Sequence, residues 1–202
     1  MKRLILVFFL GMTIHLFAQA NSLSLKAGYY FPADLKPGGV YGIDYGLRID
    51  ESVRLLVSGD FYYKSIRDDV NYGEAEELGV QIEQGEHLSQ WVGWHLPLTL
   101  KAQIEIPSGH GRIRPFASAG LGYGLTHVSY EKYSSNSSAA MTYGGFVWQL
   151  GGGVLIGLGS RSDFQIELLY NGASFEKNVS ASKFTTLNSS GLILRGGLSL
   201  DI

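Results

Sequence analysis

Charged side chains stand at alternate positions within segments that are otherwise strongly apolar. The six cations of this set are Lys26, Arg48, Arg54, Lys64, Lys101 and Arg195, and the five carboxylates are Asp44, Asp60, Glu105, Glu167 and Asp201. A buried charge without a partner is costly, whereas opposite charges held close together stabilise one another. The near balance of sign therefore predicts a network of ion pairs. Such a network would be either a structural plug or the lining of an ion path.

A second group with chemical potential is His127, Ser129 and Glu131 in "THVSYE". A serine nucleophile needs an adjacent base and an acid that orients the base. Residues two positions apart in a strand share one face, so these three side chains would lie along one side of a strand. Because that spacing is common to all strands, it does not define a hydrolase, and no enzymatic activity is expected.

The composition excludes several other kinds of site. The chain has 202 residues, no cysteine and a net charge of −2, so thiolate metal sites, cysteine nucleophiles and a basic surface for nucleic acid are all excluded. The glycine-rich stretches "GLGYG" and "GGGVLIG" open no helix, as nucleotide-binding loops do. We expect no cofactor and no metal.

The elements that carry these residues are predicted to be strands. Apolar and polar residues alternate with a period of two in eight segments: 23–31, 41–49, 53–64, 92–105, 114–125, 148–158, 164–171 and 192–202. This period is typical of strands with one apolar face, and no window fits a helix better. Glu167 and Arg195 fall on neighbouring strands and point to the same side, so we expect them to form a direct pair.

The first twenty residues differ from the rest of the chain. "MKRLILVFFLGMTIHLFAQA" has two cations, then an apolar run, then small residues at the positions that a signal peptidase reads. We interpret residues 1–20 as a cleaved secretory signal and residues 21–202 as one domain. No later stretch has the ~20 continuous apolar residues that a membrane-spanning helix needs.

The connections between the strands alternate in length. Short ones lie at 50–52, 107–112 and 159–163, and longer ones at 32–39, 67–88, 134–142 and 178–190. An even number of antiparallel strands can close into a barrel, which leaves no unpaired edge in lipid. The pattern therefore predicts an all-β, eight-stranded antiparallel up-and-down transmembrane β-barrel, with the long loops outside the cell.

A soluble secreted barrel such as a lipocalin would alternate in the same way, but two features favour the membrane. Glycines crowd the polar face, for example Gly120, Gly122 and Gly124, where a narrow lumen needs room for long neighbours. Aromatic residues gather towards the long-loop end, as in the girdle at a membrane interface. That predicted girdle comprises Tyr29, Phe31, Tyr41, Phe61, Tyr63, Trp91, Trp94, Tyr123, Tyr143, Phe146, Trp148, Tyr170 and Phe175, with only Phe116 and Phe164 at the other end.

From "LKAGYYFP" through "RPFASAGLGYG" to "GGLSLDI" the chain resembles the small eight-stranded outer-membrane proteins of the OmpA/OmpX type. Such proteins commonly end in an aromatic residue that the assembly machinery reads, whereas this chain ends in Ile202. The resemblance implies a monomer in the outer membrane, surrounded by its lipid, with a structural role or a surface partner bound through the long loops.

Two other functions remain as alternatives. One is a narrow transporter of small hydrophobic molecules, as the OmpW-like barrels are thought to be. The other is a lipid A deacylase, because His127 and Ser129 resemble the His-x-Ser of that family. Tyr130 stands where that family usually has asparagine, and no glutamate lies at the expected distance further on.

Overall fold

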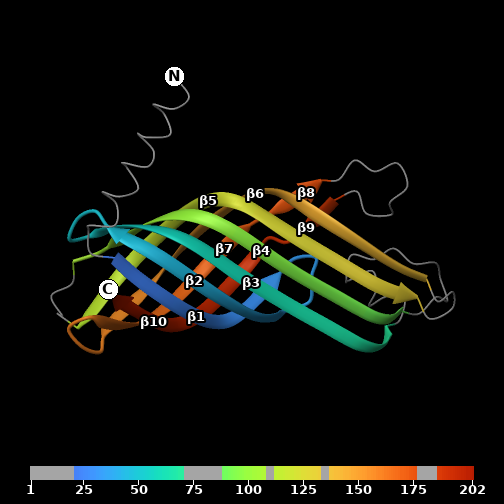
Figure 1. The fold of residues 1–202 in the computed structure, drawn as a ribbon, viewed down its shortest axis with the longest axis horizontal. Helices are drawn as coiled ribbons and strands as arrows, with labels where there is room; N and C mark the ends of the chain where they lie inside the picture. Colours follow the sequence, from blue (N-terminus) through green and yellow to red (C-terminus); the bar gives the residue numbers. More distant parts are fainter. Residues whose placement is uncertain (1–20, 71–87, 108–111, 133–136, 177–185) are drawn as a thin grey trace, which may run out of the picture.

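The computed structural model describes residues 21–70, 88–107, 112–132, 137–176 and 186–202. Eight strands form one closed antiparallel barrel in the order β1-β10-β7-β6-β5-β4-β3-β2 (Figure 1). Their bounds are β1 (Asn21–Pro32), β2 (Gly38–Arg48), β3 (Val53–Val70), β4 (Leu88–Glu105), β5 (Ile113–Lys132), β6 (Ser137–Gly157), β7 (Ser162–Gly172) and β10 (Gly191–Asp201). The predicted eight-stranded up-and-down barrel is therefore confirmed. Within the described residues, no helix is long and apolar enough to cross a bilayer.

The barrel closes because the first and last strands pair along their whole length. The β1–β10 ladder runs from Ser22 opposite Asp201 to Pro32 opposite Gly191. Each of the eight barrel strands thus has two hydrogen-bonded neighbours over the closed part of the barrel. Closure of this kind satisfies the backbone groups that would otherwise face lipid.

Side chains alternate between the outside and the lumen as the sequence predicts. Leu98 is 56% exposed, whereas its neighbour Thr99 is 4% exposed. The outward residues form an apolar belt around the barrel, which includes Leu25, Ile43, Val57, Leu98, Leu100, Leu121, Leu150, Leu168 and Leu194. A soluble protein rarely exposes so continuous an apolar surface, and the belt is what a lipid-embedded barrel requires.

The aromatic girdle is smaller than predicted. Trp91, Tyr143 and Phe175 are almost fully buried inside the barrel, and Phe116 at the other end is buried as well. Trp91 and Tyr143 stand on the inward positions of their strands, one residue out of step with the exposed Phe146 and Trp148. The prediction was wrong for these residues because it considered how near each residue lies to the loops and not whether its side chain points outward or into the lumen. The other ten aromatics of the main girdle are exposed or half-exposed.

Two strands of three residues each form a hairpin that the sequence did not predict. After β7, the short strands β8 (Ser174–Glu176) and β9 (Thr186–Asn188) pair as a separate hairpin. Phe175 and Leu187 from this hairpin are both 1% exposed, and they join the apolar cluster inside the barrel. The hairpin therefore lies over the loop end of the lumen. Ser-rich and Asn-rich segments carry little strand propensity, so they were interpreted as loop.

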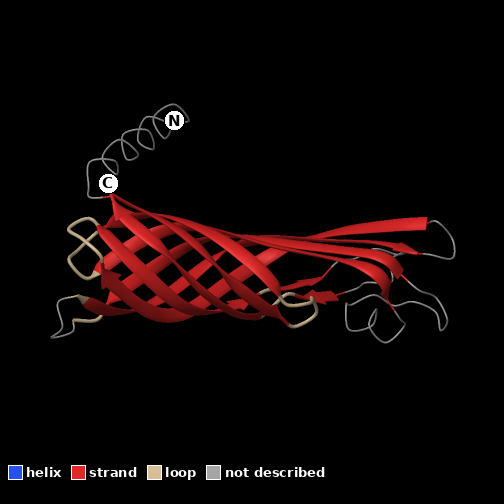
Figure 2. Cartoon of the chain, turned by 90° about the horizontal axis from the view of Figure 1, so that it is seen from below, coloured by secondary structure: helices blue, strands red, loops and turns tan. Residues whose placement is uncertain are grey.

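Four neighbouring strands are much longer than the others. β3, β4, β5 and β6 have 18 to 21 residues, whereas β1, β2, β7 and β10 have 11 or 12. β2 pairs with β3 only as far as Tyr62, and β7 pairs with β6 only from Trp148 onward. The ends of the four long strands thus extend past the closed barrel as a four-stranded sheet, here called the extension (Figure 2).

Strands that are longer than predicted shorten three of the predicted long loops. β6 begins at Ser137, so the predicted loop at 134–142 is mostly strand, and β2 begins at Gly38, so the loop at 32–39 shrinks to residues 33–37. Pairing with a neighbouring strand overrides the low strand propensity of glycine and serine in both places. The predicted loop at 67–88 is shorter as well, because β3 runs to Val70 and β4 begins at Leu88, and its residues 71–87 lie outside the described part of the chain.

Candidate functional site

Six charged side chains meet in the middle of the lumen. This central cluster consists of three cations, Lys26, Lys101 and Arg195, and three carboxylates, Asp44, Asp60 and Glu167, all at most 4% exposed. They come from six different strands, β1, β4, β10, β2, β3 and β7. The lumen is narrow enough that inward side chains from different strands meet, so the charges are compensated by one another and not by bulk water.

Arg195 is the centre of the cluster. Its Nε lies 2.7 Å from Glu167 Oε2, and its Nη1 donates to Asp60 Oδ1. Glu167 stands directly opposite Arg195 in the β7–β10 ladder, whereas Asp60 lies on β3, three strands away around the ring. The guanidinium therefore joins two walls of the barrel, and this geometry uses the fixed fork of arginine donors.

The remaining pairs complete a neutral set. Lys26 Nζ contacts Asp44 and lies 3.1 Å from Glu167 Oε2. Lys101 Nζ is 3.9 Å from Asp60 Oδ2, at the limit of an ion pair, and it has no hydrogen-bond partner among the described residues. Ser58 donates to Asp44 over 2.5 Å. Three positive and three negative charges leave the cluster without net charge.

Two glycines make room for these long side chains. A Cβ atom at Gly42 would lie 2.5 Å from Asp60 Oδ1 and 3.0 Å from Arg195 Nη1, and one at Gly120 would lie 2.6 Å from Lys101 Cγ. Such distances are shorter than van der Waals contact, so any larger residue would displace the charged groups. These inward positions therefore need glycine, because charged side chains fill the space in front of them.

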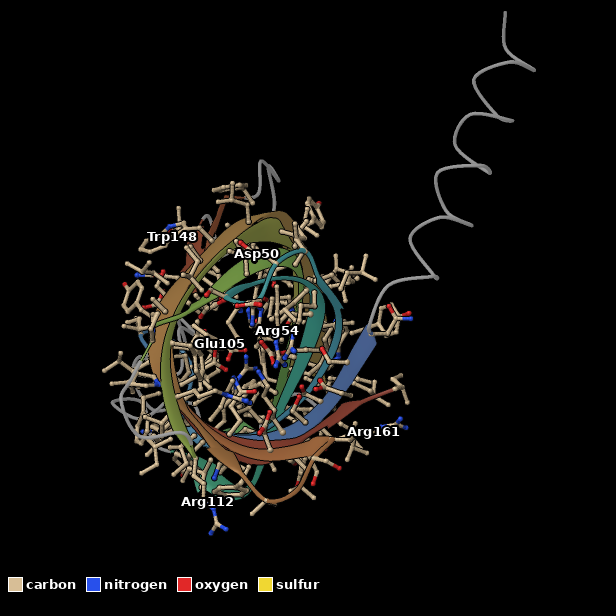
Figure 3. All side chains as sticks on the ribbon, turned by 90° about the vertical axis from the view of Figure 1, so that its left-hand side faces the viewer. Asp50, Arg54, Glu105, Arg112, Trp148 and Arg161 are labelled. Atoms are coloured by element: carbon tan, nitrogen blue, oxygen red, sulfur yellow. The ribbon has the colours of Figure 1, made fainter. Side chains whose placement is uncertain are left out.

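A second set of charges lies nearer the short turns. This turn-end cluster has three cations, Arg48, Arg54 and Arg114, and three carboxylates, Glu105, Asp163 and Asp201. Glu105 forms ion pairs with Arg54 Nε at 2.9 Å and with Arg114 Nε at 3.2 Å, while Arg114 Nη2 lies 2.5 Å from Asp163. Seen from the turn end, Arg54 and Glu105 point into the lumen, whereas Arg112 and Arg161 point away from it (Figure 3).

The sequence analysis missed Arg114 and Asp163, and it included Lys64, which lies elsewhere. Arg114 and Asp163 stand in step with the inward residues of β5 and β7, so the period of two could have found them. They were passed over because they lie at strand ends next to turns. Lys64 is half-buried near Gly38 at the base of the extension, and no ion pair joins it to another described residue.

Uncharged polar side chains form a layer on the loop side of the central cluster. Gln149 Nε2 donates to Asp60 at 3.3 Å and to Asn171 Oδ1 at 3.1 Å. Asn171 Nδ2 in turn lies 3.2 Å from the Tyr30 hydroxyl and 3.4 Å from His95 Nε2. This polar layer is buried and links the charges to the apolar cap above it.

The cap consists of the β8–β9 hairpin and the aromatic residues beneath it. The Phe175 ring lies 6.1 Å from that of His95, and it fills space above Gly145 and Gly124. The Tyr30 hydroxyl donates to the carbonyl of Ser189, which follows β9. Side chains thus occupy the lumen from the turn-end cluster to the cap, and the arrangement is suited to sealing a barrel.

The three catalytic candidates do not assemble into a triad among the described atoms. His127 Nδ1 lies 2.8 Å from Thr142 Oγ1, and the imidazole stacks on Trp94 with ring centroids 5.5 Å apart. Ser129 lies two positions further along the outer face of β5, and no hydrogen bond joins it to His127. The side chain of Glu131 lies outside the described part of the structure. Among the described residues, no group of histidine and acidic side chains could hold a metal ion.

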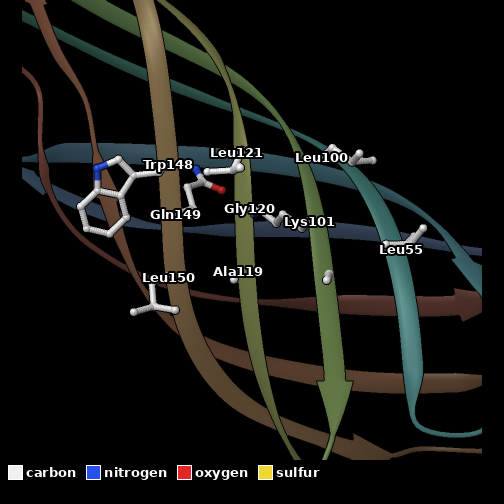
Figure 4. Close-up of a pocket in the computed structure, with 10 residues that line it drawn as sticks. Leu55, Leu100, Lys101, Ala119, Gly120, Leu121, Trp148, Gln149 and Leu150 are labelled. Atoms are coloured by element: carbon white, nitrogen blue, oxygen red, sulfur yellow. The ribbon is translucent and has the colours of Figure 1, made fainter.

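A shallow hollow lies on the outside of the barrel wall (Figure 4). It has a volume of about 570 Å³ and forms where the small residues Ala102 and Ala119 stand among Leu100, Leu121 and Trp148. Lys101 and Gln149 also border the hollow, but most of its lining residues are apolar and belong to the belt, so its chemistry suits the packing of lipid chains.

Solved structures with the same fold are outer-membrane proteins. A major outer membrane protein from Thermus thermophilus is 18% identical, with 91% of this chain and 100% of that chain covered and a TM-score of 0.61. Neisserial surface protein A is 15% identical over 91% and 97% of the two chains, with a TM-score of 0.56. The outer membrane protein OprG from Pseudomonas aeruginosa is 13% identical over 91% and 96%, with a TM-score of 0.52.

These matches confirm the predicted resemblance to small eight-stranded outer-membrane barrels at the level of the fold. No family model matches the chain, and no curated protein matches it in sequence. At such low identity a shared fold does not transfer a role, so function has to be argued from this chain's own residues.

Proposed function

We propose that this chain is a monomeric outer-membrane barrel with a sealed lumen, and that it acts through the extension and loops that project from the membrane. Its role would be structural, or it would bind a partner at the cell surface. Residues 1–20 would be removed as a signal peptide during export. The lipid of the outer membrane would surround the apolar belt.

The observation that carries the sealed lumen is the chain of contacts across it. Arg195 on β10 donates to Asp60 on β3, and Asp60 accepts from Gln149 on β6. These strands lie on different sides of the ring, so the contacts cross the lumen from wall to wall. Because the crossing groups are charged and paired, opening a path would leave at least one buried charge without a partner, which is costly.

The extension supports a role in surface contact. Beyond the closed barrel, residues 63–70 of β3 and 137–147 of β6 pair on one side only with the other described strands of the barrel. A free sheet edge can pair with an extended segment of another chain, which gives affinity through backbone hydrogen bonds. Neither a transporter nor a hydrolase needs such an edge, whereas a surface-binding protein can use it.

The orientation and the seal can be tested together on the full chain. The chain has no cysteine, so Ala140→Cys in the extension and Arg161→Cys at a short turn provide matched labelling sites. In intact cells an impermeant maleimide should label Ala140→Cys and not Arg161→Cys. In liposomes the wild-type protein should not speed the entry of small sugars or amino acids. Labelling of Arg161→Cys alone, or rapid solute entry, would refute the proposal.

The same liposomes test the two alternatives. A transporter of small hydrophobic molecules would speed the entry of a hydrophobic fluorescent probe relative to empty liposomes, and we expect no acceleration. A lipid A deacylase would release fatty acid from lipid A in the membrane, and we expect none. Ser129→Ala serves as the control for any release that is seen, because a serine nucleophile cannot act without its hydroxyl.

A further inference from the structure

The outer face of the four long strands changes its chemistry at one row of residues. Tyr63, Trp94, His127 and Thr142 stand directly opposite one another on β3, β4, β5 and β6. All four are at least partly exposed on the outside of the sheet. This set is called the aromatic row below.

The aromatic row lies at the end of the apolar belt. On β4 and β5 the preceding outward residues are Leu96 and Leu125, and Phe61 holds the same place on β3. The next outward residues towards the loops are small or weakly polar: Ser65, Val92, Ser129 and Ala140. The row is therefore the boundary between the lipid-facing wall and the part of the extension beyond it.

Contacts within the row hold its rings in place. The rings of Trp94 and His127 stack at 5.5 Å and 18° between planes. His127 Nδ1 bonds to Thr142 Oγ1 at 2.8 Å, and no described residue bonds to its Nε2. The Tyr123 hydroxyl lies beside Gly144, because a Cβ there would be 2.7 Å from it. The stacked pair of rings is thus bordered by an imidazole nitrogen and hydroxyl groups.

We propose that the aromatic row binds the sugar headgroup of a glycolipid whose acyl chains lie on the adjoining apolar belt. The negative face of an aromatic ring attracts the C–H groups of a pyranose, and neutral hydroxyl and imidazole groups exchange hydrogen bonds with sugar hydroxyls. The row has no charged side chain, so it does not match a headgroup recognised through phosphate alone. The proposal rests on the proposed function, since it requires this end of the barrel to lie in a glycolipid-bearing leaflet.

The test uses the folded full-length protein in phosphatidylcholine nanodiscs. The probe is a monoglycosyl diacylglycerol, and the comparison lipid is a phosphatidylglycerol with the same acyl chains. Lipid that stays bound is counted by native mass spectrometry during a titration. The wild type should retain the glycolipid about tenfold more tightly than phosphatidylglycerol, which corresponds to about 1.4 kcal/mol.

Variants separate the aromatic row from general lipid contact. Trp94→Leu should weaken glycolipid binding about tenfold, a change of about 1.4 kcal/mol, and leave phosphatidylglycerol binding unchanged. His127→Phe keeps a ring but loses both nitrogens, so it should also weaken glycolipid binding. Tyr29→Leu is the matched control, because Tyr29 is an outward aromatic on β1, outside the row, whose ring lies 5.1 Å from that of Phe31 and is tilted against it.

Equal retention of the two lipids by the wild type would overturn the inference. The inference would also be overturned if the folded Trp94→Leu and His127→Phe proteins bound the glycolipid as tightly as the wild type does. Cysteine labelling and solute entry, measured on the same protein, keep the two proposals apart. If the barrel is sealed and Ala140→Cys is labelled from outside, but the protein shows no preference for the glycolipid, only this inference is refuted. Labelling of the opposite end refutes the proposed function.

Discussion

Removing the positive charge of Arg195 should destabilise the barrel more than any other single charge removal in the lumen. Arg195 is buried and pairs with both Asp60 and Glu167. Without it, three carboxylates face two lysines in the central cluster. Asp60 would keep only Lys101 at 3.9 Å and the amide of Gln149 at 3.3 Å. Breaking a buried pair by removing one partner costs about 3–5 kcal/mol, and Arg195→Gln should reach that range.

A second substitution tests whether this loss comes from imbalance of charge. Glu167→Gln alone leaves three cations against two carboxylates, so it should cost about 3–5 kcal/mol as well. The double variant has two of each sign and is neutral again. It should be no less stable than the worse single variant, so the coupling between the sites should be at least as large as the smaller single loss, about 3 kcal/mol.

The assay is urea unfolding of the protein in phosphatidylcholine vesicles, followed by tryptophan fluorescence. Arg161→Gln is the matched control, because Arg161 is exposed at a short turn (Figure 3), and its loss should change stability by less than about 0.5 kcal/mol. If the two single losses simply add in the double variant, the charges do not act as one cluster and the reasoning is refuted.

Three further substitutions test other parts of the structure in the same assay. Leu98→Arg places a charge in the apolar belt and should cost about 2–4 kcal/mol, whereas Thr99→Arg should act by crowding the lumen; a harmless Leu98→Arg would mean that the faces are misassigned. Gly42→Ala should cost about 1–3 kcal/mol because its Cβ would meet Asp60, while Gly39→Ala has open space and serves as its control; equal effects would contradict the packing argument. Phe175→Ala should cost about 3–5 kcal/mol if the ring fills the cap as described, and a negligible loss would show that it does not.

The period of two was sufficient to predict the strands, their faces and the closed barrel. In lipid a strand has few alternatives, because each backbone group needs a partner and each outward side chain must be apolar. The same rule placed Lys26, Asp44 and Arg195 on the inside. It predicted the Glu167–Arg195 pair, which joins neighbouring strands, but not the pairs across the lumen. Arg195 and Asp60 come from strands three steps apart, and their relative heights depend on the register of every intervening ladder.

The elements that the sequence did not reveal are those set by tertiary contacts. Ser137 to Ala140 extend β6 because β5 provides a partner, although serine and alanine have little strand propensity. The β8–β9 hairpin forms over the lumen, where Phe175 and Leu187 are buried by residues from distant strands. Trp91 and Tyr143 were assigned to the girdle from their place near the loops, but their position in the alternation puts them inside.

The seal of the lumen is the central claim, and current through single barrels in a planar lipid bilayer tests it most directly. Wild-type protein, inserted and checked for folding, should give no steady ionic current. Phe175→Ala should remain closed too, because the central cluster and the polar layer still cross the lumen beneath the cap. A sustained wild-type current whose ion selectivity changes in Glu167→Gln would contradict the account, because it would mean that ions pass through the central cluster.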